Sequence, residues 1–245
     1  MRIAIVSDIH EDIRNLEKAM KKIKVLGYDA LLCLGDITGF APVFYNHEPD
    51  ANACIEMLRS HSAISVVGNH DLFTVGRLPS YHNSIGMAEN WYNISFEDRK
   101  KMTFDKVWVY NDEILPDLTP ENKHYLNNLE EHVILETKIG NVLFSHFLKP
   151  DMAGATKWFP FKCSQLKEHF GFIKQNDCKV AICAHSHQAG IAVASKFLWF
   201  TLNYEHYRVK SSRKIIICPP IVSGKSIAGF VIFDSQKGIL SPHVV

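Results

Sequence analysis

Residues 2–36, RIAIVSDIHEDIRNLEKAMKKIKVLGYDALLCLGD, decide the fold of this chain. Two apolar runs, residues 2–6 and 30–34, flank residues 12–26, in which Ile13, Leu16, Met20 and Ile23 recur at helical spacing. This pattern predicts a strand, a helix and a second strand. A polar motif follows each apolar run, and open α/β sheets place their chemistry at the carboxyl ends of such strands.

The rest of the chain extends this unit. Residues 51–59 predict a helix with Asp50 as its N-cap, and residues 63–67 predict a third parallel strand. A helix is expected over 119–129, with Thr119 as N-cap and Pro120 in the first turn. Residues 132–138 and 141–145 predict a hairpin, and residues 161–175 a further helix. Short strands are expected at 179–183, 191–193, 197–201, 214–218 and 227–233.

Length and composition indicate one globular domain. With 245 residues and 47% hydrophobic content, the chain fits a single domain over 1–245, with residues 72–131 as a helical, cap-like insertion. A net charge of +1 provides no general attraction for nucleic acid or anionic lipid, so we expect a small-molecule partner and no membrane. Six cysteines without a C-x-x-C pair, and no leader-like segment, favour the cytoplasm.

Five short motifs of Asp, Asn and His follow predicted strands. They are SDIH (7–10), LGD (34–36), GNHD (68–71), SH (145–146) and AHSH (184–187). Asp8 and His10 are two residues apart, so in an extended segment both side chains point the same way. Taken alone, each motif has a simpler explanation, such as a helix-capping Asp or an incidental His. Together they predict a site for two cations, since Asp and His bind Mn, Fe or Zn together.

The GNHD motif is the most specific of the five. Gly68 permits an unusual turn, and the three residues after it point in different directions. Asn69 is therefore expected to bind a metal, His70 to face the substrate, and Asp71 to steady the imidazole of His70. The alternative is an ordinary polar loop. Asp36 is the candidate bridge, because a carboxylate can place its two oxygens on two ions.

The motifs resemble those of the calcineurin-like metallophosphoesterase superfamily, whose pattern runs D-x-H, G-D, G-N-H-[DE], H and G-H-x-H in this order. The resemblance implies a four-layer αββα sandwich of two mixed β-sheets flanked by helices. It also implies that Asp36 bridges two metals and that His70 assists catalysis. The implied ligands of the first metal are Asp8, His10 and His187, and those of the second are Asn69, His146 and His185.

A narrower resemblance links the chain to small bacterial and archaeal phosphodiesterases. It rests on GDITGFAP (35–42) and LTPE (118–121), which are similar to GDIVGYGP-like and LSPE-like segments of that subgroup. The chain departs from the family at Ala184 and Phe147, where glycine is usual, and at Glu11-Asp12, where Gly-Asn is common. The region 218–226 is a degraded form of a family segment, and residues 45–50 form an extra loop. None of these changes removes a predicted ligand.

The expected function is hydrolysis of phosphate esters, by a phosphodiesterase or broad phosphatase. The expected mechanism is in-line attack by a metal-bridging hydroxide at a dinuclear site of Mn, Fe or Zn, with Mn favoured. Two other activities of the same fold are a diadenosine-polyphosphate hydrolase and a serine/threonine phosphoprotein phosphatase. A non-catalytic scaffold is the third possibility, because a fold alone does not fix a function.

Overall fold

The computed structural model of the protein describes residues 1–209, 212–224 and 226–245 and contains two six-stranded sheets. The first sheet has the order β3 (Ile64–Ser65), β2 (Ala30–Cys33), β1 (Arg2–Val6), β11 (Gly229–Asp234), β12 (Ile239–Val244) and β9 (Tyr207–Arg208). The second has the order β4 (His132–Leu135), β5 (Asn141–Ser145), β6 (Cys178–Cys183), β10 (Lys214–Ile217), β7 (Ile191–Ala194) and β8 (Trp199–Leu202).

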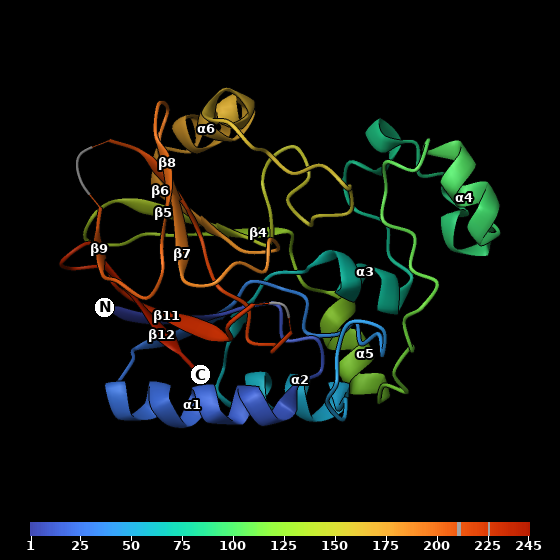
Figure 1. The fold of residues 1–245 in the computed structure, drawn as a ribbon, viewed down its shortest axis with the longest axis horizontal. Helices are drawn as coiled ribbons and strands as arrows, with labels where there is room; N and C mark the ends of the chain where they lie inside the picture. The colour runs from blue at the N-terminus through green and yellow to red at the C-terminus, as the bar shows by residue number, and fades with distance from the viewer. Residues whose placement is uncertain (210–211, 225) are drawn as a thin grey trace.

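Helices cover the outer faces of both sheets (Figure 1). On the first sheet lie α1 (Ile13–Leu26) and α2 (Ala51–Ser60), and α5 (Pro120–Asn127) packs beside α2 and the short α3 (Asn69–Val75). On the second lies α6 (Lys167–Gln175). Both sheets mix parallel and antiparallel neighbours, so the expected αββα sandwich of two mixed sheets is confirmed.

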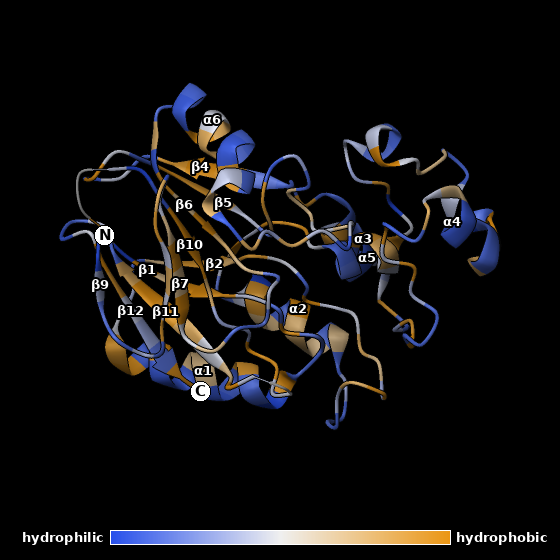
Figure 2. Ribbon diagram, turned by 45° about the horizontal axis from the view of Figure 1, so that its top comes forward, coloured by the Kyte–Doolittle hydropathy of each residue, from blue (hydrophilic) through white to orange (hydrophobic). Residues whose placement is uncertain are grey.

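Alternation along the strands explains the layers. In β1, Ala4 and Val6 pack with the helices, whereas Ile3 and Ile5 point into the space between the sheets. Phe144 of β5 and Ile182 of β6 meet them from the second sheet. Figure 2 shows the strands as mainly hydrophobic and the outer helices as mixed. Each fully buried large side chain contributes roughly 1.5–3 kcal/mol, so this central layer holds the two sheets together.

Most predicted elements are present, and their caps agree. Asp12, Asp50 and Thr119 cap their helices by accepting from the backbone N–H three residues on, and β1, β2 and β3 are parallel as expected. The predicted hairpin is also present as β4 and β5. However, its first arm ends at Leu135, because Thr137 and Gly140 exchange backbone hydrogen bonds and close the turn.

Three elements differ from those predicted from the sequence. The helix expected over 161–175 begins later, because Gln165 Oε1 accepts the Phe161 and Lys162 N–H groups and holds a 3-10 turn over Cys163–Leu166. The third strand shortens to two residues. Strand β12 was not predicted, since it contains Pro242, which cannot donate to a ladder. Pro242 pairs with Val231 on one side, and β9 pairs only with residues 239 and 240.

Residues 72–131 run from the second half of α3 to the start of the hairpin. They contain 3-10 turns at His82–Ile85 and Trp91–Asn93, α4 (Phe96–Met102) and α5, and they form a small core of Met87, Trp91 and Val107. Residues 107–114, called the strap below, are fastened at both ends by the isolated bridges Val107–Thr156 and Phe40–Ile114. The strap thus joins the loop after β2 to the loop after β5.

Among the described residues, no helix has the length and apolar character needed to span a bilayer.

The buried His169 predicts that stability falls in acid. Burial first, and then Lys149, lower the pKa of His169 to about 3, and its Nδ1 accepts the Lys149 N–H at 2.9 Å. Because this folded-state pKa lies below the ordinary 6.5, the unfolded chain binds the proton more readily. The free energy of unfolding should therefore fall as the pH drops from about 6.5 toward 3, by up to about 1.4 kcal/mol per pH unit.

His169→Gln keeps an acceptor for the Lys149 N–H but cannot titrate. We expect urea midpoints, measured with a chelator at about pH 7.5 and about pH 5, to fall less for this variant than for the wild type. Equal falls in the two proteins would show that His169 does not contribute.

Candidate metal centre

The seven predicted ligands lie together at one end of the two sheets. Asp8 and His10 follow β1, Asp36 follows β2, and Asn69 starts α3. From the second sheet, His146 follows β5, and His185 and His187 follow β6. Six of the seven are buried, and His187 is partly exposed. Strands that end at the same edge therefore bring residues 179 positions apart into one cluster, as the positions of the motifs predict.

Five of the seven have a left-handed backbone, which non-glycine residues rarely adopt. The φ angles are 47° for Asp8, 47° for His10, 52° for Asp36, 71° for His185 and 49° for His187. Such conformations cost roughly 1–3 kcal/mol each and persist where surrounding bonds enforce them. Here the loops after β1 and β2 hold each other: the N–H groups of Ile9 and His10 both donate to the carbonyl of Asp36.

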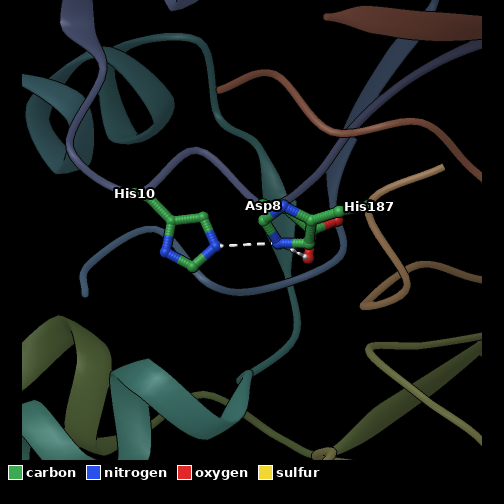
Figure 3. A group of neighbouring side chains, drawn as sticks. All are labelled: Asp8, His10 and His187. Carbon is green, nitrogen blue, oxygen red and sulfur yellow. Dashed lines mark hydrogen bonds and ion pairs between the residues drawn. The ribbon is translucent and has the colours of Figure 1, made fainter. Parts of the chain in front are cut away.

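Asp8, His10 and His187 form one group (Figure 3). The Nε2 atoms of His10 and His187 lie 3.1 Å apart, and His187 Nε2 lies 3.4 Å from Asp8 Oδ1. His10 Nδ1 faces the Gly39 carbonyl at 3.0 Å and donates its proton there. The lone pair of His10 Nε2 therefore points into the group, which is how a second hydrogen bond orients a metal-binding histidine.

Asp36, His146 and His185 form a second group. His146 Nε2 lies 3.1 Å from Asp36 Oδ2, 3.2 Å from Asn69 Oδ1 and 3.0 Å from His185 Nδ1. His146 Nδ1 donates to the Leu34 carbonyl at 2.7 Å, so its Nε2 also presents a lone pair. Asp36 Oδ2 lies 4.0 Å from His10 Nε2 of the first group. Asp36 thus stands between the two groups, where the sequence predicts the bridge.

The donor set fits divalent cations. Each group brings ligand atoms within 4.8 Å of one another. In both groups a nitrogen lone pair faces a carboxylate or a second imidazole, an arrangement that a shared cation satisfies. Asp8 Oδ1 is buried and, among the described residues, has no hydrogen-bond donor. A buried carboxylate oxygen without a donor is costly unless a cation lies against it.

Glycine makes room for Asp36. A Cβ atom on Gly68 would overlap the Asp36 carboxylate, and one on Gly35 would overlap the backbone of Gly68. Asp36 Oδ1 in turn accepts the N–H of His70 at 3.0 Å. The two glycines therefore allow the second and third motifs to pack backbone against backbone.

The catalytic pair predicted from sequence needs a correction. His70 lies beside the centre, with Nε2 4.0 Å from Asp36 Oδ2, but its Nδ1 contacts the carboxylate of Glu113 in the strap. Asp71 does not contact the imidazole: its Oδ1 accepts from Ile37 N, Thr38 N and Thr38 Oγ1, and its Oδ2 accepts from Gly68 N. The predicted direct contact between Asp71 and the imidazole is therefore not formed, although the Asp71 carboxylate, after Glu113 and Asp36, also raises the pKa of His70.

Comparison with known proteins agrees with this geometry. The family model described as calcineurin-like phosphoesterase matches residues 1–189. The chain belongs to the calcineurin-like phosphoesterase family. It is 36% identical over 85 residues to the uncharacterized protein MJ0912 of Methanocaldococcus jannaschii, a match that spans 34% of this chain and 32% of that protein.

Solved structures share the calcineurin-like phosphoesterase fold. A metallophosphoesterase from Sphaerobacter thermophilus has a TM-score of 0.67 at 22% identity. The match covers 100% of this chain and 88% of that protein's chain. An archaeal phosphodiesterase has a TM-score of 0.50 at 15% identity over 100% of both chains. The neighbours thus include the small phosphodiesterases that the motifs resemble. The family uses divalent metal ions, and the two groups above are where this chain offers ligands.

Burial and neighbouring charges together shift the pKa values of the titratable groups in this site. Burial alone would raise the pKa of Asp8, but His187 lowers it to about 2. Burial would lower the pKa of His146, but Asp36 raises it to about 9. Burial, together with His146, lowers the pKa of His185 to about 3. The cluster therefore holds closely packed carboxylates and imidazoles whose protonation depends on one another.

The pKa values of His70 and Glu11, which lie beside the two ligand groups, are also shifted. Burial would lower the pKa of His70, but Glu113 and then Asp36 raise it to about 9. Burial raises the pKa of Glu11 to about 7. Glu11 Oε1 accepts the N–H groups of Gly39 and Phe40, and the Gly39 carbonyl accepts from His10. Glu11, at a position where the family commonly has Gly, thus positions a predicted ligand.

Sequence reasoning missed Glu113, Tyr110 and Gly154. Tyr110 accepts a hydrogen bond from Asn69 Nδ2, and its ring lies 4.6 Å from that of His70. A Cβ on Gly154, whose φ is 78°, would lie 2.9 Å from both Asn69 Oδ1 and His185 Nδ1. None of the three belongs to a motif or a regular element. The one signal in the sequence is the pair of aromatic residues Trp108 and Tyr110 within the predicted cap-like insertion.

Gly68→Ala should weaken Mn²⁺ binding, because the added methyl group displaces the Asp36 carboxylate. A fall of roughly 10- to 100-fold in affinity is expected, as for other changes that misorient a ligand. Isothermal titration of the metal-free protein with MnCl₂ measures it. Gly171→Ala is the matched control, since its Cβ meets nothing within 4 Å. Equal affinities in the two variants would contradict this role of Gly68.

Proposed function

We propose that the protein hydrolyses small phosphate esters at a site that holds two divalent cations, with Mn²⁺ favoured. The position of Asp36 between the two ligand groups carries this proposal, because its carboxylate lies within reach of both. When bound, such cations activate water and neutralise charge on the phosphoryl oxygens. The family supports metal-dependent phosphoester hydrolysis in general, and the dinuclear mechanism is our inference.

His70 is the proposed acid. Its Nε2 points toward Asp36, and Glu113 contacts Nδ1 on the other side of the ring. A proton on Nδ1 is thereby held by Glu113, which leaves Nε2–H free to protonate the leaving oxygen as the P–O bond breaks. Glu113 and Asp36 both favour the protonated imidazole, as an acid at neutral pH requires. Glu113 acts here as a positioning residue.

The size of the site agrees with a small substrate. A cavity of about 370 Å³ opens directly over the two groups and is lined by Asp36, Asn69, His70, His185 and His187 among others. This volume lies in the lower part of the range found for small-molecule sites, roughly 300–1,000 Å³. A small ester is therefore the proposed substrate, and the cytoplasm remains the predicted location.

Hydrolysis of p-nitrophenyl esters tests the function first. With Mn²⁺ present, the wild type should cleave bis-p-nitrophenyl phosphate, p-nitrophenyl phosphate or both, and the absorbance of p-nitrophenol reports the rate. Asp36→Asn should abolish activity and reduce the Mn²⁺ bound, because it removes the shared negative charge. Cleavage of the diester favours a phosphodiesterase, and a monoester preference favours a phosphatase. Absence of both Mn²⁺ binding and turnover in the wild type would favour the scaffold.

Removing His70 should separate chemistry from metal binding. We expect His70→Ala to lower kcat by roughly 10²- to 10⁴-fold while Mn²⁺ binding, measured by titration calorimetry, is kept. Glu113→Gln should also lower kcat, but should have no further effect in the His70→Ala background, because it acts through that imidazole. Asp117→Asn removes an exposed carboxylate nearby and serves as control. Multiplying effects in the double variant would contradict a positioning role.

A further inference from the structure

The walls of the cavity over the centre are largely aromatic. Besides the ligand side, it is lined by Phe44, Tyr45, Trp108, Tyr110 and Phe159. They come from three separate segments: the loop after β2, the strap, and the loop after β5. Aromatic side chains therefore surround the space into which the non-phosphate part of a bound ester would extend.

Two of these aromatics are fixed against the ligand histidines. The ring of Tyr45 stacks on His10, with centroids 5.0 Å apart and an interplanar angle of 29°. The ring of Phe159 stacks on His185, with centroids 5.0 Å apart and an angle of 3°. Each ligand group thus has an aromatic ring against one of its imidazoles.

The outer aromatics are exposed to solvent in the cavity. Phe44 is 63% exposed and Phe159 is 40% exposed. A turn places Phe44 there, since the N–H groups of residues 44 and 45 both donate to the Ala41 carbonyl. Exposed phenylalanines also occur elsewhere on this chain, as at Phe197. These two differ because they line one cavity over the centre, where a bound planar ring would cover their faces.

The described residues of the cavity offer few positive charges to a chain of phosphates. Among the described residues of its lining, Lys157 is the one lysine and there is no arginine. Lys157 already pairs with Asp105 at 2.6 Å and lies over the Trp108 ring. The strap adds Asp112 and Glu113 to the lining. A phosphate beyond the one at the metals would meet carboxylates instead of the cations that polyphosphate binding requires.

We propose that this cavity selects esters in which a single phosphoryl group carries a planar aromatic group, an aryl ring or a nucleobase, held against Phe44 and Phe159. The proposal rests on the function proposed above and adds its substrate class. Stacking of a base on an aromatic side chain contributes roughly 1–3 kcal/mol, so the planar group should raise kcat/KM by about 5- to 160-fold.

Two pairs of substrates test the planar group, with Mn²⁺ present throughout. 5′-AMP and ribose 5-phosphate both carry the phosphate on the primary 5-hydroxyl of a ribose and differ by the base. Benzyl phosphate and cyclohexylmethyl phosphate are similar in size and apolar character, but only the first is planar. We expect the planar member of at least one pair to have the higher kcat/KM, and ADP and diadenosine tetraphosphate to be poorer substrates than 5′-AMP. No preference for the planar member in either pair would overturn the proposal, as would a preference for the polyphosphates.

Two variants of the cavity test which side chains hold the planar group. Phe159→Leu and Phe44→Leu keep an apolar side chain but remove the ring, and each should reduce the planar-to-non-planar ratio of kcat/KM by about threefold or more. Phe197→Leu changes an exposed phenylalanine outside the cavity lining and should leave the ratio unchanged. Unchanged ratios in both cavity variants would overturn the placement of the ring.

Binding gives a second readout that does not need turnover. Titration calorimetry with the phosphonate analogues of 5′-AMP and ribose 5-phosphate should show tighter binding of the first, and Phe159→Leu should reduce the difference. If bis-p-nitrophenyl phosphate is cleaved but neither planar compound has an advantage over its non-planar partner in rate or binding, the substrate class is wrong and the proposed function stands. If nothing is cleaved, the proposed function fails, and the binding comparison still decides whether the cavity takes a planar group.

Discussion

The buried carboxylate of Asp36 is the interaction on which the rest of the site depends. Its Oδ1 accepts the N–H of His70, and its Oδ2 lies near His146 and His10, so one side chain fixes the third motif and faces both ligand groups. Gly68 must lack a side chain for this to be possible. The carbonyl of Asp36 also accepts two N–H groups from the first motif. Backbone and side chain of one residue therefore connect three of the five motifs.

The sandwich supplies the burial that gives these contacts their strength. Strands β1 and β2 send alternate side chains to the helices and to the second sheet, and their loops emerge between the layers. Charges in such a place interact much more strongly than at a surface, which is why His70 and Asp8 have displaced pKa values. The same burial penalises any unpaired charge. The left-handed backbone at five ligands is stable because the layers leave those loops little freedom.

The sequence predicted the parts of this structure that follow regular patterns. Apolar alternation and capping residues placed β1, α1, β2 and α2, and the residue types at the ends of strands indicated which side chains would meet. It did not predict Glu113, because no periodic pattern fixes where an irregular strap of residues will pass. It did not predict the contacts of Asp71 for a related reason: the direction of a side chain in a tight turn depends on hydrogen bonds to residues 37 and 38, which are distant in the chain.

The strap has a consequence for how this fold can diversify. It is fastened at residues 107 and 114 to the loops after β5 and β2, and it belongs to neither six-stranded sheet. Insertions or substitutions in the strap would change the part of the cavity lining that the strap forms, while the strand registers and the ligand loops stay as they are. The contact between Glu113 and His70 limits this freedom, because Glu113 of the strap also positions the proposed acid His70. The strap can therefore differ between related chains, as long as a carboxylate at the position of Glu113 still contacts the imidazole of His70.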